Sequence, residues 1–357
     1  MTPKLQSLID EINPPAAGLA KEGQARLDSL TKPKGSLGAL EEIALSLWRV
    51  QGERPLSADP AMIYTVAADH GVTEEGISLY PPAVTRQMVE NFLKDGAAIN
   101  VLCKTLGIGL MVVDAGCMGN SFPEHPRLVS MKIAEGTANF TQGPAMTGSQ
   151  LFNCLDNGIS LAADAAKKGM RCIGLGEMGI GNTTTASALF SAFLGLNPEE
   201  IVGPGAGLPP GGLPRKAEAL RTALEFHEKA VASGDPIQIL CALGGFEIAT
   251  LAGIVLGAAR NGMTVMVDGF ITTAAYLAAW KICPAVSGYC LFSHVSQEKG
   301  HSLVLPLLER KPLLNLDLRL GEGTGAALGI ALLRSAAAIF NDMSTFESAG
   351  ISGPRED

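Results

Sequence analysis

The sequence predicts an α/β fold in which a parallel sheet carries helices on both faces, together with a small helical domain. Two observations lead to this prediction. Short apolar runs alternate along the chain with longer helical stretches, as in parallel sheets that are covered on both sides. The 357 residues are 47% hydrophobic but only 5% aromatic, and 42 of them are glycine. Such small side chains let helices pack closely on a sheet, and we therefore expect a Rossmann-like arrangement.

The individual elements follow from the apolar runs in chain order. Six runs have the length and residue types of buried strands, namely 62–68, 110–115, 171–176, 237–243, 263–269 and 289–294. The stretches between them predict helices at 84–106, 148–168, 184–195, 214–232, 246–260 and 271–282. We expect residues 59–330 to form a large α/β domain that carries the active-site cleft. Residues 1–58 and about 331–357 lack clear strands, and we expect them to form a small helical domain built from both chain ends.

Composition excludes several classes of partner. The net charge of −8 disfavours nucleic acid or an anionic membrane as a main partner. The N-terminus has no apolar segment of signal-peptide length, and Glu247 or Arg334 interrupts the long apolar stretches, which predicts buried helices instead of membrane spans. The seven cysteines show no CxxC pair and no metal-ligand spacing. We therefore expect a cytoplasmic protein with small-molecule substrates and no metal site.

Polar residues follow each of the six predicted strands. In open α/β sheets, ligands bind beyond the carboxyl ends of the strands. Any single acid–glycine pair could also be an ordinary turn, but six in succession predict one cleft. The groups at these strand ends are Asp69-His70-Gly71, Asp114-Ala115-Gly116, Glu177, Gly244-Gly245-Phe246-Glu247, Asp268-Gly269 and Ser293-His294.

The segment GLGEMGIGNTTTASAL, residues 174–189, leaves a predicted strand through glycines and enters a predicted helix at Asn182. Glycine admits close backbone approach, and the free N–H groups of a helix start attract an anion. A phosphate cradle is one interpretation, and a tight strand-to-helix turn without a ligand is the other. Gly174, Gly176 and Gly179 also match the dinucleotide pattern GxGxxG, but Glu199 and Glu200, at the distance of its ribose-binding acid, lie in a helix-to-loop segment.

Two further loops are expected at this cleft. Residues 203–218 are rich in glycine and proline, and this segment contains the basic residues Arg215 and Lys216. Residues 318–329 place Glu322 between two glycines before a small-residue helix. Glu322 is either a carboxylate that faces a ligand or a helix-start acid favoured by the helix dipole.

Several long segments occur in the order found in one enzyme family. They are LTKPKGSLGALEEIA (30–44), DHGV (69–72), PPAVTRQMV (81–89), GEMGIGNTTTASAL (176–189), VDGFITTAA (267–275), SHVSQEKGH (293–301) and LGEGTGAALG (320–329). Over nearly the whole chain, the sequence resembles the nicotinate-nucleotide–dimethylbenzimidazole phosphoribosyltransferases, which prepare the lower ligand of cobalamin.

The resemblance implies a reaction and a set of site residues. A nitrogen of 5,6-dimethylbenzimidazole attacks C1′ of nicotinate mononucleotide, and nicotinate and α-ribazole 5′-phosphate form without a cofactor. The resemblance also implies a homodimer whose N-terminal segment reaches the partner's active site. Glu322 matches the general base. The residues that match the mononucleotide-binding segment are Glu177, Gly179, Gly181, Asn182, Thr183 and Thr184.

Four further positions are expected to contact the substrates. Lys216 and Ser293 are candidate phosphate or ribose contacts, and Gln87 matches the region that lines the base pocket. Tyr80 stands where the family has a small hydroxyl residue, which leaves open whether a benzimidazole, a purine or a phenolic base is the acceptor. Two other functions are the alternatives, namely an NAD-dependent oxidoreductase and a non-catalytic nucleotide-binding sensor.

Overall fold

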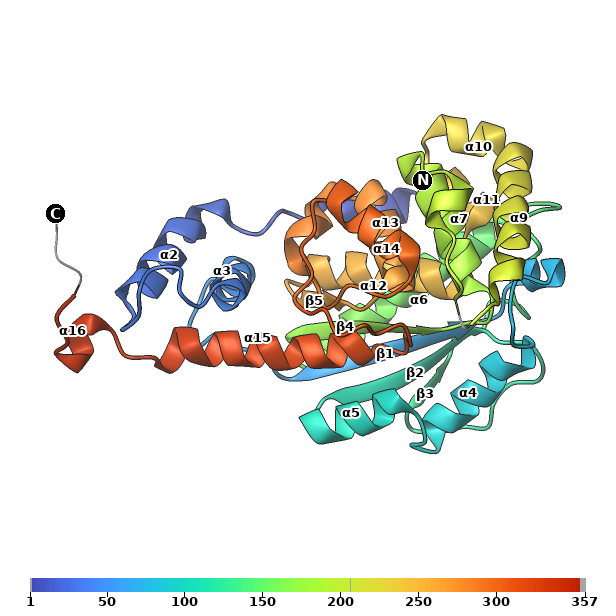
Figure 1. Ribbon diagram of the computed structural model, residues 1–357. Coiled ribbons are helices and arrows are strands. Elements are labelled where there is room, and N and C mark those ends of the chain that lie inside the picture. The colour runs from blue at the N-terminus through green and yellow to red at the C-terminus, as the bar shows by residue number, and fades with distance from the viewer. Residues whose placement is uncertain (1, 206, 354–357) are drawn as a thin grey trace.

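A computed structural model describes residues 2–205 and 207–353, and it contains a six-stranded parallel sheet (Figure 1). The strands are β1 (Ala61–Ala68), β2 (Gly109–Gly116), β3 (Leu128–Ser130), β4 (Cys172–Met178), β5 (Thr264–Val267) and β6 (Cys290–Phe292). Their order across the sheet is β3-β2-β1-β4-β5-β6. This order reverses direction between β1 and β4, which is where such sheets bind ligands. The predicted fold class is confirmed.

Helices cover both faces of the sheet, because successive side chains of a strand point to opposite sides. Tyr64 and Val66 of β1 pack into one core with α6, α12 and α13. Ile63 and Ala67 pack into a second core with α3, α5 and α15. Figure 1 shows α6 and α12 on one side of the sheet and α4 and α5 on the other. The larger helices are α3 (Ala39–Gln51), α4 (Ala83–Leu93), α5 (Ala98–Leu106), α6 (Gly148–Lys167), α7 (Asn182–Leu194), α9 (Leu213–Phe226), α12 (Phe246–Arg260), α13 (Phe270–Ile282) and α15 (Thr324–Asp342).

The predicted strand at 237–243 is wrong, because this segment forms the helix α11 (Pro236–Leu243). Asp235 caps the helix by accepting a hydrogen bond from Ile237 N at 2.8 Å, and Pro236 occupies the first helical position. An acidic cap followed by proline favours a helix start. A short apolar run alone does not distinguish a strand from a buried helix. Consequently Gly244–Glu247 follow a helix and not a strand.

Other boundaries also differ from the prediction. The expected helix 84–106 is two helices, α4 and α5, because Asp95 has a left-handed φ of 61° between them. The expected helix 214–232 is α9 followed by α10 (Glu228–Ser233). β3 was not predicted, since it has only three residues at the edge of the sheet. The other five strands lie where the sequence predicts them.

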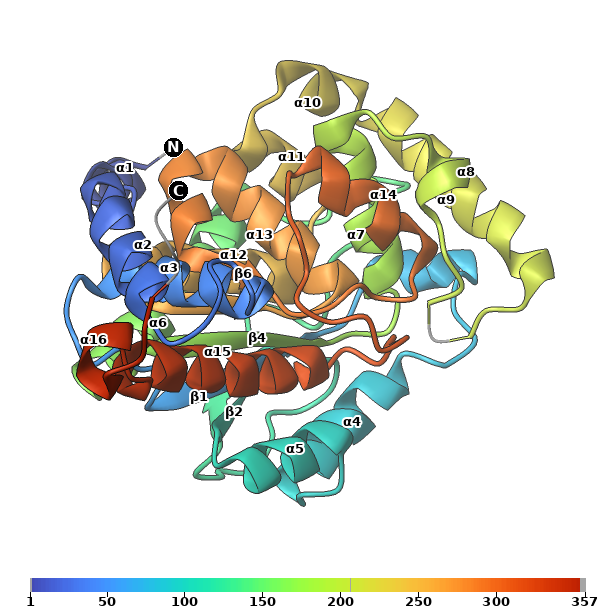
Figure 2. The same cartoon turned by 60° about the vertical axis from the view of Figure 1, so that its left-hand side comes forward.

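Segments from both ends of the chain meet at α15. In Figures 1 and 2, α2 (Ala20–Ser29) and α3 lie beside the end of α15, next to α16 (Phe346–Ala349). Trp48 and Phe340 bring their rings to 5.5 Å between centroids, and Arg26 donates hydrogen bonds to the last carbonyls of α15. By contrast, Leu5 and Leu8 of α1 (Pro3–Asp10) belong to the core that contains α12. The division into a large domain and a small helical domain stays a prediction.

Only α15 among the described residues is long and apolar enough to cross a membrane. It lies against β4, α3 and α5, and 56% of its most apolar stretch is buried in the protein. The helix begins at Thr324, directly after Gly323, and the Glu322 loop before it lies at the carboxyl ends of the strands.

Candidate active site

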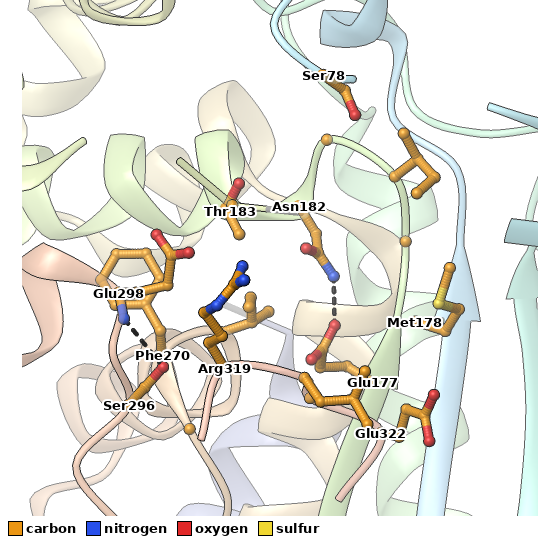
Figure 3. Close-up of a pocket in the computed structure, with 18 of the residues that line it drawn as sticks. Ser78, Glu177, Met178, Asn182, Thr183, Phe270, Ser296, Glu298, Arg319 and Glu322 are labelled. Carbon is orange, nitrogen blue, oxygen red and sulfur yellow. Dashed lines mark hydrogen bonds between the residues drawn. The ribbon is translucent and has the colours of Figure 1, made fainter. Parts of the chain in front are cut away.

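A cavity of about 380 Å³ opens at the carboxyl ends of β4, β5 and β6 (Figure 3). Most of the surface that lines it is apolar, with a few convergent polar groups, as in many small-molecule sites. The lining residues come from the segments 77–88, 177–183, 204–205, 269–271, 294–298 and 319–322.

Most of the polar residues at strand ends support loops and do not line this cavity. Asp69 accepts a hydrogen bond from Met118 N at 2.7 Å, and Asp268 accepts one from Ala326 N at 2.8 Å. His70 and Glu247 form a fully buried pair at 2.8 Å. Of the predicted strand-end residues, Glu177, Gly269 and His294 line the cavity. The prediction that these six groups point to one cleft is therefore wrong for most of their polar side chains, because these side chains find their partners within the protein.

The connection from β4 to α7 forms one wall of the cavity. Gly174 and Gly176 lie within β4, so they do not form the phosphate-binding turn of a dinucleotide fold. A side chain at Gly176 would collide with the carbonyl oxygen of Glu322, 2.3 Å from where its Cβ would lie. Gly181 precedes α7 with a left-handed φ of 97°, which favours glycine. The N–H of Thr183 makes no hydrogen bond to another described residue.

Glu177 is buried at the base of this wall. Asn182 donates a hydrogen bond from Nδ2 to Glu177 Oε2, as Figure 3 shows. Burial raises the pKa of Glu177 to about 8, the Asn182 hydrogen bond opposes this rise, and the charges of Asp268 and Glu322 add to it. At neutral pH, the protonated form of Glu177 is therefore favoured.

Glu322 lines the cavity from the loop before α15 and has a left-handed φ of 63°. Thr65 donates to its carbonyl oxygen at 2.8 Å, and its N–H donates to the carbonyl of Glu177 at 3.2 Å. Its carboxylate oxygen Oε2 accepts a hydrogen bond from Ile99 N at 3.2 Å. Burial raises the pKa of Glu322, and the Ile99 hydrogen bond opposes that rise. A carboxylate with a raised pKa in a cavity is suited to accept a proton.

The opposite end of the cavity carries the basic groups. Lys216 is fully buried behind Thr183 and donates to Thr183 Oγ1 at 2.7 Å and to Gly203 O at 3.0 Å. Burial lowers the pKa of Lys216 to about 8, and the Glu298 carboxylate opposes this change. Arg319 and Ser296 line the cavity directly (Figure 3). This end can hold an anion, whereas the Glu322 end can accept a proton.

The structure brings most of the predicted site residues together. Tyr80, Glu177, Gly179, Gly181, Asn182, Thr183 and Glu322 all line the cavity. Thr184 and Ser293 are buried away from it, and Lys216 stands behind Thr183. Gln87 is exposed and also does not line it.

Sequence reasoning missed several lining residues. On α4, Val84 and Met88 line the cavity. They are four residues apart and share a helix face, whereas Gln87 points elsewhere. This apolar spacing is the signal that could have identified Met88. Ser296 and Glu298, also missed, lie in the same quoted segment as Ser293, but no local pattern distinguishes which of its polar residues face the cavity.

The described residues contain no cluster of His, Cys, Asp or Glu side chains that could hold a metal ion. All seven cysteines are unpaired. Burial lowers the pKa of His294, which lines the cavity, to about 4, so its imidazole is neutral at neutral pH.

Comparisons with known proteins extend over nearly the whole chain. A family model described as Phosphoribosyltransferase matches residues 12–351. A protein of Nitratidesulfovibrio vulgaris strain DP4, named nicotinate-nucleotide–dimethylbenzimidazole phosphoribosyltransferase, is 56% identical over 353 residues, or 99% of each chain. A protein of the same name from Chlorobaculum tepidum is 44% identical over the full length of both chains. The crystal structure of the Thermus thermophilus protein of that name matches with a TM-score of 0.89 and 42% identity, over 95% of this chain and 99% of that one.

Proposed function

Because the chain belongs to the family of nicotinate-nucleotide–dimethylbenzimidazole phosphoribosyltransferases, we propose that it transfers the phosphoribosyl group of nicotinate mononucleotide to 5,6-dimethylbenzimidazole or a related base. The products are α-ribazole 5′-phosphate and nicotinate, and the reaction serves cobalamin nucleotide-loop assembly. The observation that carries this proposal is one cavity that is lined by Arg319, Ser296 and the start of α7 at one end and by the Glu322 carboxylate at the other.

The chemistry uses one nucleophilic displacement. A base nitrogen forms a bond to C1′ while the bond from C1′ to the pyridinium nitrogen breaks, with inversion at C1′. The bonding electrons go to the nicotinate ring and remove its positive charge. The attacking base becomes cationic and gives its N–H proton to a carboxylate, for which Glu322 is the candidate. No step calls for a redox reagent, and holding two aromatic reactants together supplies much of the rate.

The phosphate of the donor fits the basic end of the cavity. Gly181 and the free N–H of Thr183 lie at the start of α7, where helix N–H groups attract anions. Arg319 supplies a cation directly, and Lys216 acts through the hydroxyl of Thr183. Ser296 can donate a further hydrogen bond from the opposite wall.

The acceptor base fits the apolar end. Val84 and Met88 of α4 and Met178 of β4 supply a hydrophobic wall, and Tyr80 stands at its rim with 47% of its surface exposed. Glu322 lies at the same end. Tyr80 offers a hydroxyl group and a ring to the acceptor, so its identity bears on which base is preferred.

Two alternative functions are less well supported. An NAD-dependent oxidoreductase would need the glycines of GxGxxG in a turn, but Gly174 and Gly176 lie inside β4. Glu199 and Glu200 belong to the short helix α8 (Pro198–Ile201) and not to a strand end. A non-catalytic sensor gives no reason for a buried carboxylate on a left-handed backbone facing the cavity.

We also propose that the enzyme is a cytoplasmic homodimer whose N-terminal segment reaches the partner's cavity. Leu303 and Leu307 lie on one face of α14 (Lys299–Leu307) and are 40% and 53% exposed. Leu316 and Leu320, on the loop beside the cavity, are also exposed. Exposed apolar groups of this kind are typical of an interface. Light scattering of the wild type and of Leu307→Glu tests the dimer, because the charged variant should dissociate into monomers.

A direct assay tests the enzymatic function. The purified protein is incubated with nicotinate mononucleotide and a panel of benzimidazole, purine and phenolic bases, and nicotinate release is measured by chromatography. We expect release that depends on both substrates and yields an α-linked nucleotide. Tight NAD binding without nicotinate release would favour the oxidoreductase, and mononucleotide binding without turnover would favour the sensor.

A further inference from the structure

One oxygen of the Glu322 carboxylate is fixed by a backbone group outside its own loop. Ile99 N lies 3.2 Å from Glu322 Oε2 and donates the only hydrogen bond that this carboxylate receives from the described residues. Ile99 is the second residue of α5, so its N–H has no acceptor within the helix. Oε1 accepts no hydrogen bond from the described residues, and the Glu322 side chain lines the cavity.

The start of α5 is itself held in place by a buried side chain. Asn100 Oδ1 accepts a hydrogen bond from Ala97 N at 3.1 Å, and its Nδ2 donates to Phe92 O at 2.8 Å. Asn100 therefore ties the first turn of α5 to the end of α4. The same helix α4 lines the apolar end of the cavity with Val84 and Met88. The wall that faces the acceptor base lies on α4, and the backbone N–H that donates a hydrogen bond to Glu322 lies on α5. Asn100 joins these two helices.

The main chain of Glu322 is clamped independently of its side chain. Thr65 donates a hydrogen bond to the Glu322 carbonyl, and the Glu322 N–H donates one to the carbonyl of Glu177. Glu322 also has a left-handed φ, which is unfavourable for any residue that has a side chain. Strained residues of this kind persist where the surroundings over-determine them, often at active sites. With the backbone fixed, the direction of the carboxylate depends on what its oxygens contact.

We propose that the first turn of α5 is a positioning element for the general base, in which the Ile99 N–H holds Oε2 and leaves Oε1 free to take the proton of the acceptor. This inference rests on the proposed function. It assigns a role in the reaction to a backbone group and to Asn100, although neither Ile99 nor Asn100 lines the cavity.

A pH profile can isolate this contact, because the other groups around Glu322 stay the same. The titratable groups that face it are Glu177 from β4 and Asp268 after β5, and Arg319 lies in its own loop. β1 contributes the neutral Thr65. Removing a hydrogen-bond donor from a carboxylate raises its pKa. The acidic limb of kcat/KM for the acceptor should then move to higher pH.

The test compares Ile99→Pro with Ile99→Val. Proline removes the N–H, whereas valine keeps it with the same number of side-chain carbons as proline. Proline is tolerated in the first turn of a helix, and α9 already carries Pro214 at its second position. We expect the acidic limb of Ile99→Pro to lie about one pH unit above that of Ile99→Val. Melting temperature and nicotinate mononucleotide affinity should match between the two variants.

Asn100→Ala provides a second test if Ile99→Pro does not fold. It loosens the same turn without removing the N–H, so a smaller shift in the same direction is expected. An unshifted limb in the folded proline variant, or in Asn100→Ala when that variant takes its place, would overturn the inference while the proposed function stands. A wild-type protein that releases no nicotinate would overturn both.

Discussion

Replacing Glu322 by glutamine tests the proposed general base with a small structural change. The amide oxygen of glutamine can accept the same Ile99 hydrogen bond that Oε2 accepts at 3.2 Å. The left-handed backbone and its contacts with Thr65 and Glu177 stay in place. The variant should therefore keep its shape and its affinity for both substrates. What it loses is a group that can take the proton of the acceptor.

The expected effect follows from the role of a positioned base. Such groups contribute roughly 10²- to 10⁴-fold, which corresponds to about 2.7–5.5 kcal/mol of barrier. We therefore expect kcat to fall by roughly two to four orders of magnitude in Glu322→Gln. Stability at neutral pH should not fall, because burial already raises the pKa of Glu322 and a neutral amide avoids that penalty.

The assay measures kcat by nicotinate release and both affinities by calorimetric titration. Glu177→Gln is the matched control, since Glu177 lines the same cavity and its carboxyl group accepts a hydrogen bond from Asn182. We expect Glu177→Gln to act mainly through nucleotide affinity. Near-normal kcat in Glu322→Gln, combined with a collapse of kcat in Glu177→Gln, would refute the reasoning and exchange the two roles.

Three further predictions address the rest of the cavity. Tyr80→Ser should change the relative turnover of dimethylbenzimidazole, adenine and phenolic acceptors in competition assays while nicotinate mononucleotide affinity stays constant, and an unchanged ranking would place Tyr80 outside the base pocket. Thr183→Val removes the hydroxyl that accepts a hydrogen bond from Lys216 at 2.7 Å; calorimetry should show about tenfold weaker mononucleotide binding, and an unchanged Kd would remove Thr183 from the phosphate site. The folded-state pKa of Glu177 is raised from 4.5 to about 8, so the folded state keeps a proton that the unfolded chain loses, and the contribution of Glu177 to stability should fall as pH rises from about 4.5 to about 8. The melting temperature of Glu177→Gln relative to wild type should therefore increase across that range, and a difference independent of pH would contradict the buried, protonated carboxyl.

The sheet could be predicted from sequence because its strands are apolar runs separated by helices. The run at 237–243 had the same appearance, and only the Asp235-Pro236 cap distinguishes it as a helix. This cap is a local signal for a helix, because an acidic residue followed by proline favours a helix start. β3 offered no such signal, because three residues at a sheet edge bury too little to leave an apolar run.

The candidate site was predictable where loop chemistry decides it. Gly181 and Glu322 stand out in the sequence as a helix-start glycine and a carboxylate between glycines, and both line the cavity. The direction of a side chain on a regular element is harder to predict. Gln87 and Met88 are neighbours, and only the register of α4 against the sheet decides that Met88 faces the cavity. Likewise, Ser296 lines the cavity and Ser293, three residues before it, does not.

The buried acids near the cavity favour a cationic donor. Asp268 and Glu322 add to the raised pKa of Glu177, and Glu322 adds to that of Asp268. The pyridinium of nicotinate mononucleotide brings a positive charge toward them, which favours the ionised Glu322 that the acceptor needs. During transfer the ring loses this charge, and Glu322 becomes neutral when it takes the proton. The net charge at the acidic end therefore stays the same from bound substrates to bound products, so the low-dielectric cavity need not stabilise a charge that appears during the reaction.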